Sequence, residues 1–84
     1  MEDAHLEGAD LWQADLWNSQ PDGAHFDGAT LGYANLQFAR LRFASLARVE
    51  LEGANLNGAD LRVAHLEGAE FKDAQLCGPR RASY

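Results

Sequence analysis

The chain has 84 residues, enough for one small domain, and at this size a single apolar core is only marginally sufficient. Thirteen acidic residues against seven basic ones give a net charge of −6, which disfavours direct binding to nucleic acid or to an anionic membrane and favours basic partners. Cys77 is the only cysteine, which excludes an internal disulfide. No apolar run reaches membrane-spanning length, and the acidic start MEDAHLEGAD is unlike a signal peptide, so we expect a cytoplasmic protein.

A five-residue repeat begins at residue 4 and continues to residue 78. Leu or Phe occupies every fifth position from Leu6 to Leu76 in fourteen of fifteen cases, and alanine stands two residues earlier in thirteen of fifteen. The unit is A-x-L-x-x, and its exceptions are Ser19, Pro21 and Val49. We predict one repeat domain over 4–78, followed by a flexible tail over 79–84.

The spacing of this repeat predicts very short strands and excludes a helix. At about 100° per residue, a period of five scatters the leucines around a helix axis. In an extended segment, by contrast, the small and the large apolar residue of each unit lie two apart and share one side. Glycine at the fifth place of several units, as at Gly8 and Gly28, indicates a sharp turn after each strand.

A copied hexapeptide suggests how these strands stack. AHLEGA occurs at residues 4–9 and again at 64–69, with the near-copy AHFDGA at 24–29. If four units close one square coil, residues twenty apart lie above one another at the spacing of paired strands, about 4.8 Å. An amide-rich column then forms, with side chains that are able to hydrogen-bond up the stack, from Asp15, Asn35, Asn55 and Gln75.

The segments ADLWQADLWN and GANLNGADL follow the motif A(D/N)Lxx, and from residue 4 to residue 78 the sequence resembles the pentapeptide-repeat family. The resemblance implies an all-β fold: a right-handed quadrilateral parallel β-helix of about four coils of 20 residues, with the Leu/Phe and Ala side chains inside. It implies one kind of turn where glycine fills the fifth place and allows a second kind elsewhere. Pro21 departs from the pattern, and we expect its missing N–H to lie on the open side of the first coil.

Function must lie on the outer surface, where charge is polarised. One side is an acidic face with Lys72 as its counter-charge, formed by Asp10, Glu50, Glu52, Glu70 and Asp73. The opposite side carries three arginines and two aspartates, Arg40, Arg42, Arg62, Asp22 and Asp60. Because some members of the family resemble DNA and protect DNA gyrase from quinolone drugs, the resemblance offers an alternative function as a DNA-mimicking inhibitor or protector of a type II topoisomerase. A four-coil rod is short for that role, and a solvated acidic face is the simpler interpretation.

Outward aromatic residues give a stronger indication of binding. The candidate interaction surface consists of Trp12 and Trp17 in the first coil and of Tyr33, Phe38 and Phe43 at the corners of the second. Large exposed apolar groups gathered in one patch usually contact another molecule. The alternatives are self-association, a different protein partner, or rings that only stack on one another and shield the backbone.

The sequence gives little support to metal binding or catalysis. His5, His25 and His65 share one column with a carboxylate two residues on, but outward side chains of this kind need not converge on an ion. Ser45 lies between two of these histidines, yet a filled rod offers no cleft for a nucleophile and its base. We therefore predict no metal, no cofactor and no enzymatic activity.

The two ends of the stack are its weak points, because each exposes strand edges and leucines. We expect another copy to cover at least one end, unless the chain is part of a larger one. The favoured function is a non-catalytic module that presents a rigid surface to itself, end to end or through the aromatic patch, or to another protein.

Overall fold

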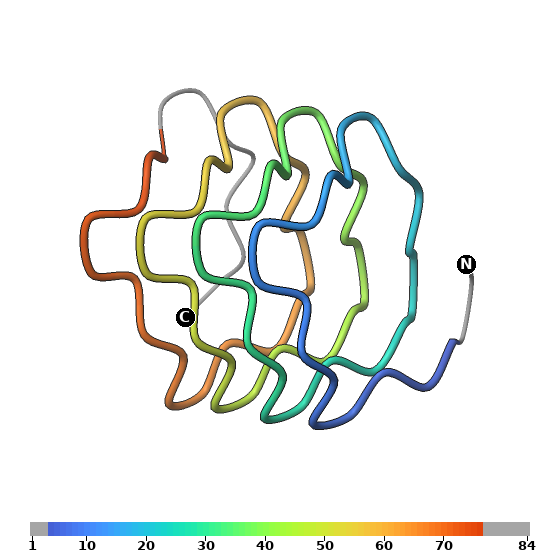
Figure 1. Cartoon of the computed structure of the whole chain (residues 1–84). Helices are drawn as coiled ribbons and strands as arrows, with labels where there is room; N and C mark the ends of the chain where they lie inside the picture. Colours follow the sequence, from blue (N-terminus) through green and yellow to red (C-terminus); the bar gives the residue numbers. More distant parts are fainter. Residues whose placement is uncertain (1–3, 77–84) are drawn as a thin grey trace.

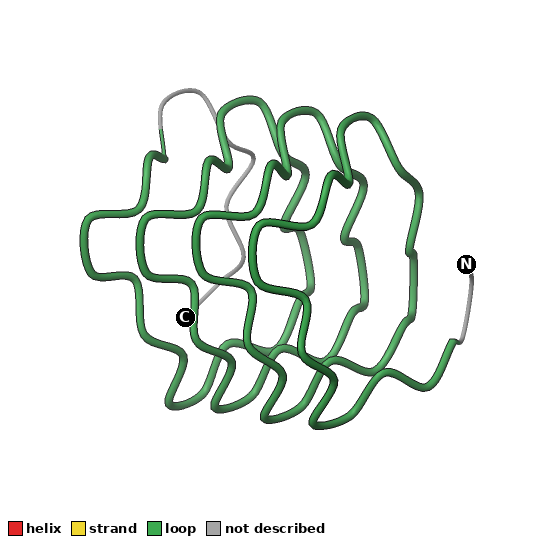
Figure 2. Ribbon diagram, viewed as in Figure 1, coloured by secondary structure: helices red, strands yellow, loops and turns green. Residues whose placement is uncertain are grey.

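The computed structural model describes residues 4–76, which wind as a four-sided solenoid around one apolar core (Figure 1). Every bridge between neighbouring coils is parallel and joins residues twenty apart, as in the column Asp15, Asn35, Asn55 and Gln75. Each strand is a single bridged residue, so within this part of the chain the ribbon is drawn throughout as loop (Figure 2). The predicted square coil of twenty residues is confirmed.

Three kinds of backbone hydrogen bond hold successive coils together. The Leu6 N–H donates to the His25 carbonyl at 2.7 Å, and the His25 N–H donates back to the Ala4 carbonyl at 2.8 Å. At the corner, the Gly8 N–H donates to the Asp27 carbonyl at 2.9 Å. The same pattern recurs on the other sides of the coil, so both strands and corners contribute to stacking.

All corners use one turn, whether or not glycine fills the fifth place. Alanine closes the turn, as in the 3.0 Å bond from the Ala9 N–H to the Leu6 carbonyl. The fifth residue has a positive φ at six glycines and at eight other residues, among them Tyr33 at 55° and Val63 at 61°. The second kind of turn allowed by the resemblance is therefore absent from residues 4–76. The stacked hydrogen bonds impose the left-handed conformation even on residues that disfavour it.

The apolar core follows the five-residue repeat. Leu36 and Leu56 are each 1% exposed, and the alanines two residues before them are equally buried. The leucines and the phenylalanine nearest the two ends, Leu6, Leu11, Leu16, Phe71 and Leu76, are only partly buried. The inward direction of both apolar places is confirmed, and so is the exposure of apolar side chains in the first and last described coils.

Pro21 does not lie as the sequence predicts. In this stack, the N–H of the residue at the central place donates toward the following coil, as Leu16 does to Asn35 at 2.8 Å. The missing N–H of Pro21 therefore faces Arg40 inside the stack and not the open side, so the expectation was wrong. Pro21 is fully buried, and its carbonyl still accepts the turn bond from Ala24 at 3.0 Å. The coil tolerates one lost bond because its neighbours hold the register.

The Asp15 column also departs from its prediction. Asn35 and Asn55 direct their Oδ1 atoms at the backbone N–H groups two residues on, of Gln37 at 3.1 Å and of Asn57 at 3.0 Å. Asp10, Asp15 and Asp60 make the same bond to their own corners. This short-range bond gives Asp and Asn a physical role before the central leucine, because each caps a corner N–H.

No helix among the described residues is long and apolar enough to cross a membrane.

Candidate interaction surface

The surface is best described by four walls and four corners. The walls are named after one bridged residue each: the His5 wall, the Asp10 wall, the Asp15 wall and the Arg40 wall. Four corners separate the walls, and each consists of two neighbouring residues and their counterparts every twenty residues along the chain. In chain order they are the Glu7 corner (starting at residues 7–8), the Trp12 corner (12–13), the Trp17 corner (17–18) and the Arg42 corner (22–23). The Asp10 wall and the Arg40 wall are therefore opposite faces.

The structure brings the predicted acidic face together. Asp10, Glu50 and Glu70 lie in one column of the Asp10 wall, joined by the bridges Asp10 to Thr30, Thr30 to Glu50, and Glu50 to Glu70. Glu52 and Asp73 lie on the adjoining Trp12 corner with Lys72. Five carboxylates against one ammonium group leave this region at a net charge of −4.

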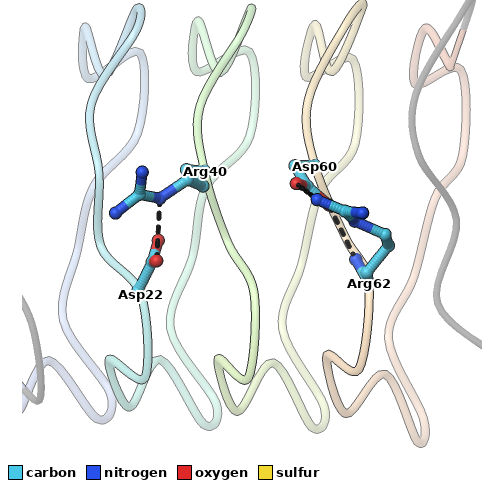
Figure 3. A network of polar contacts seen from close by, with 4 residues as sticks. All are labelled: Asp22, Arg40, Asp60 and Arg62. Carbon is cyan, nitrogen blue, oxygen red and sulfur yellow. Dashed lines mark hydrogen bonds and ion pairs between the residues drawn. The ribbon is translucent and has the colours of Figure 1, made fainter.

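The arginine side of the molecule is largely neutralised by its own carboxylates. The Arg40 Nε donates to Asp22 Oδ2 of the neighbouring coil at 2.8 Å (Figure 3). Arg62 donates two hydrogen bonds, of 2.9 and 2.7 Å, to the Asp60 carboxylate. The pair with Asp60 raises the pKa of the Arg62 guanidinium above its ordinary value. The two sides are therefore unequal, because only the acidic face retains a large net charge.

The aromatic residues form two edge-to-face pairs on neighbouring corners. Trp12 and Tyr33 meet at the Trp12 corner with ring centroids 5.1 Å apart, and Trp17 and Phe38 meet at the Trp17 corner at 6.4 Å. The Asp15 wall separates the two pairs. Phe43 does not join them, because it lies on the Arg42 corner, where the Arg42 guanidinium carbon is 5.5 Å from its ring centroid. The predicted surface is thus one aromatic strip of four residues plus a separate ring.

Glycines that sequence reasoning missed hold these rings in place. Each of three rings lies over a glycine: Trp12 over Gly32, Tyr33 over Gly53, and Phe38 over Gly58. At Gly58, an added Cβ would be 2.6 Å from the Phe38 ring. In each case the glycine lies one coil further on, so its spacing of twenty residues from the ring was a signal that could have found it. The rings still expose 51% to 56% of their surface. Stacking and exposure therefore occur together, with one face of each ring supported.

The first two histidines of the column, His5 and His25, stack on each other. The rings of His5 and His25 lie parallel, with centroids 4.8 Å apart and an interplanar angle of 5°. The His5 Nδ1 lies 3.2 Å from Glu7 Oε2. Hydrogen bonds from its own backbone N–H and, secondly, from His5 lower the pKa of the Glu7 carboxyl below its ordinary value. Nowhere in residues 4–76 do three His, Cys, Asp or Glu side chains converge as metal ligands do.

The described part of the chain has no pocket. Ser45 bridges His25 and His65 on the convex surface of the His5 wall. The tail predicted over 79–84 and the single cysteine, Cys77, lie outside the described residues, as does any cover that the tail gives to the end of the stack.

A family model described as "Pentapeptide repeats" matches residues 4–42 and 44–78. Among solved structures, the pentapeptide repeat protein Rfr23 from the cyanobacterium Cyanothece 51142 is similar at a TM-score of 0.91 and 32% identity, covering 95% of this chain and 54% of that one. The pentapeptide repeat protein alr5209 from Nostoc follows with a TM-score of 0.73 and 28% identity, covering 93% of this chain and 72% of that one. Comparison with curated proteins found no match. This chain therefore spans only about half the length of the Rfr23 structure.

Proposed function

This chain belongs to the pentapeptide repeat family, and on that premise we propose that it is a non-catalytic interaction module whose exposed aromatic strip binds protein. The partner is a second copy or a different protein in the cytoplasm. In this proposal the scaffold is a right-handed quadrilateral β-helix of about four coils, and it needs no cofactor. The aromatic strip consists of Trp12, Tyr33, Trp17 and Phe38.

One observation supports the proposal above all: four large rings are more than half exposed, while three of them rest on the glycine of the following coil and Trp17 packs against Phe38. Aromatic side chains bury much apolar area on binding and have few torsions to immobilise. A ring already held against a glycine loses less entropy when a partner covers it. The strip is therefore suited to contact with protein.

The test replaces both tryptophans, Trp12→Ser and Trp17→Ser, because each belongs to a different pair. We expect the circular dichroism of the variant to match that of the parent, while self-association or retention of a partner is lost. Val63→Ser is the matched control, since Val63 is an exposed apolar residue on the Arg42 corner. Light scattering over a range of concentrations and affinity capture with both variants are the measurements. Assembly that survives in the double variant would contradict the proposal.

The acidic face supports a second candidate function, binding to DNA gyrase as a mimic of DNA. Glu50 and Glu70 are bridged neighbours, so like charges follow one another along the Asp10 wall. Such a strip offers an anionic surface to a protein that binds phosphates. Gyrase supercoiling assays with and without a quinolone test this candidate: no effect of the protein on either reaction would exclude it.

A further inference from the structure

We infer that the partner binds the Trp12 corner through an arginine- or lysine-bearing segment, and that this partner is a different protein and not a second copy. The inference rests on the proposed function, because it names what the aromatic strip recognises. It uses one end of the strip, where the pair Trp12 and Tyr33 adjoins the acidic face. The other pair, Trp17 and Phe38, lies beyond the Asp15 wall.

Rings and carboxylates at this corner share one rigid frame. Trp12 packs over Gly32, and Tyr33 packs over Gly53, the residue next to Glu52. The Tyr33 N–H donates to the Glu52 carbonyl at 2.8 Å, which fixes the two coils relative to each other. An aromatic face beside a carboxylate attracts a cation by two mechanisms, through the ring quadrupole and through the negative charge.

Two of the carboxylates near the rings have no side-chain partner within the described part of the chain. The side-chain carboxylates of Glu50 and Glu52 make no hydrogen bond or ion pair among residues 4–76, although the backbone of both residues is hydrogen-bonded to neighbouring coils. Asp10 differs, since its Oδ1 accepts bonds from the Trp12 N–H and the Thr30 hydroxyl, both at 3.2 Å. Glu50 also lies next to Glu70 in the column. A cation bound here would reduce the repulsion between like charges, so the corner favours a positively charged occupant.

A second copy is a poor source of that cation. Two copies meeting symmetrically at this corner would bring the same carboxylates together. Arg40 and Arg62 are already paired with Asp22 and Asp60 in their own chain. The side formed by those residues and Arg42 has a net charge of only +1, from three arginines and two aspartates. The other two basic residues among 4–76, Arg48 and Lys72, lie on corners where carboxylates outnumber them, the Glu7 corner and the Trp12 corner. We therefore expect the positive charge to come from another protein.

Arginine fits the corner better than lysine. Its planar guanidinium stacks on an aromatic face and, in the same pose, donates two parallel hydrogen bonds to a carboxylate. The ammonium group of lysine offers a point charge without a stacking plane. We therefore expect binding to rank arginine above lysine, and lysine above a neutral residue.

The experiment uses an end-blocked peptide, Gly-Arg-Gly-Arg-Gly, with the Lys and Gln versions as matched probes. Trp17→Phe in the full chain leaves Trp12 as the sole tryptophan, so its fluorescence reports on this corner. We expect the Arg peptide to quench the Trp12 fluorescence saturably and the Gln peptide to bind more weakly by roughly tenfold. Binding of the Arg peptide should also weaken when NaCl is raised from about 50 mM to about 500 mM. Equal binding of the Arg and Gln peptides, or no saturable response, would overturn the inference.

Charge variants locate the binding. Glu50→Gln with Glu52→Gln should weaken the Arg peptide by roughly tenfold. Glu7→Gln with Glu67→Gln is the control, because it changes the net charge by the same amount but on the Glu7 corner. It should change the affinity for the Arg peptide by less than about twofold. An equal loss of affinity in both double variants would show that the peptide responds only to the net charge of the protein, and would overturn the inference.

The two proposals fail in different ways. If the Arg peptide does not bind but Trp12→Ser with Trp17→Ser abolishes assembly, the inference is overturned and the interaction module stands. If the double variant keeps every assembly of the parent protein, both are overturned.

Discussion

The ring of Trp12 lies over Gly32, so that a methyl group at residue 32 would occupy the space of the indole. Gly32 does not have a positive φ, unlike the glycines at the fifth place, and its backbone accepts alanine without strain. The absence of a side chain at residue 32 therefore serves the packing of the ring one coil earlier.

Gly32→Ala should displace the Trp12 ring and lower the free energy of unfolding by about 1–3 kcal/mol, the usual cost of overpacking. In a Trp17→Phe background, the emission of Trp12 should shift to longer wavelength as the ring enters water. Gly28→Ala is the control, because Gly28 has a φ of 71° and nothing within 4 Å of an added Cβ. It should cost stability through its backbone and leave the emission unchanged. A Trp12 spectrum unaltered by Gly32→Ala would refute this packing.

Leu36→Ala should reduce the free energy of unfolding by about 2–5 kcal/mol, because it leaves a cavity in a filled core. Leu6→Ala is the comparison: Leu6 lies at an end and is only partly buried, so its loss should cost clearly less. Urea denaturation monitored by circular dichroism measures both. Equal losses at the two positions would mean that the end coils are covered in solution.

Val63→Asn should stabilise the protein by up to about 1 kcal/mol. Val63 is β-branched and exposed, yet it has a φ of 61°, a conformation that asparagine adopts more readily. Val63→Thr keeps the branching and should bring no gain of that size. Thermal unfolding of the three proteins decides the matter, and a lower midpoint for Val63→Asn would contradict the strain at this corner.

Asn35→Ala should cost about 1 kcal/mol, because the Gln37 N–H loses the acceptor at 3.1 Å. Ser45→Ala changes the equivalent place on the His5 wall, where no such cap is recorded among the described residues, and should cost less. Chemical denaturation gives both values, and hydrogen exchange at Gln37 reports the lost bond directly. Unchanged exchange at that amide would argue against the cap.

Titration of Glu7 by NMR should give a midpoint below the ordinary value for glutamate. Its own backbone N–H and the His5 ring both favour the ionised carboxylate, so the pKa in the folded state is lowered. The resulting stabilisation is present above the pKa of the unfolded chain and is lost as pH falls through the folded value. His5→Ala should raise the midpoint only in part, because the backbone bond remains. A full return to the ordinary value would assign the whole shift to His5.

The sequence could predict what depends on period alone. The burial of Leu36 and Leu56, the coil of twenty residues and the gathering of the acidic face all follow from counting along the chain. It could not predict that the missing N–H of Pro21 would face the following coil, because a period has no direction along the axis. It also could not show that the oxygens of Asn35 and Asn55 bond to their own corners, since that choice depends on side-chain torsions.

The aromatic surface was predictable in part for the same reason. Spacing gathered Trp12, Trp17, Tyr33 and Phe38 in one candidate surface, but it did not show which rings pair or which way each ring leans. The rings of Trp12, Tyr33 and Phe38 lean toward the following coil and rest on glycine. Phe43 was grouped with them as a corner residue of the same coil, although a further wall separates it from the nearest pair.

The fixed register of twenty residues has a consequence for how such a protein changes by insertion and deletion. Removing one five-residue unit would leave the apolar interior in phase, yet every later coil would be rotated by a quarter turn about the axis. Glu50 would then no longer follow Thr30, and each side of the rod would combine the first part of one column with the last part of another. Indels of a single unit can therefore reshuffle the exterior of this protein without disturbing its interior, whereas duplications of a complete coil preserve each side as it is.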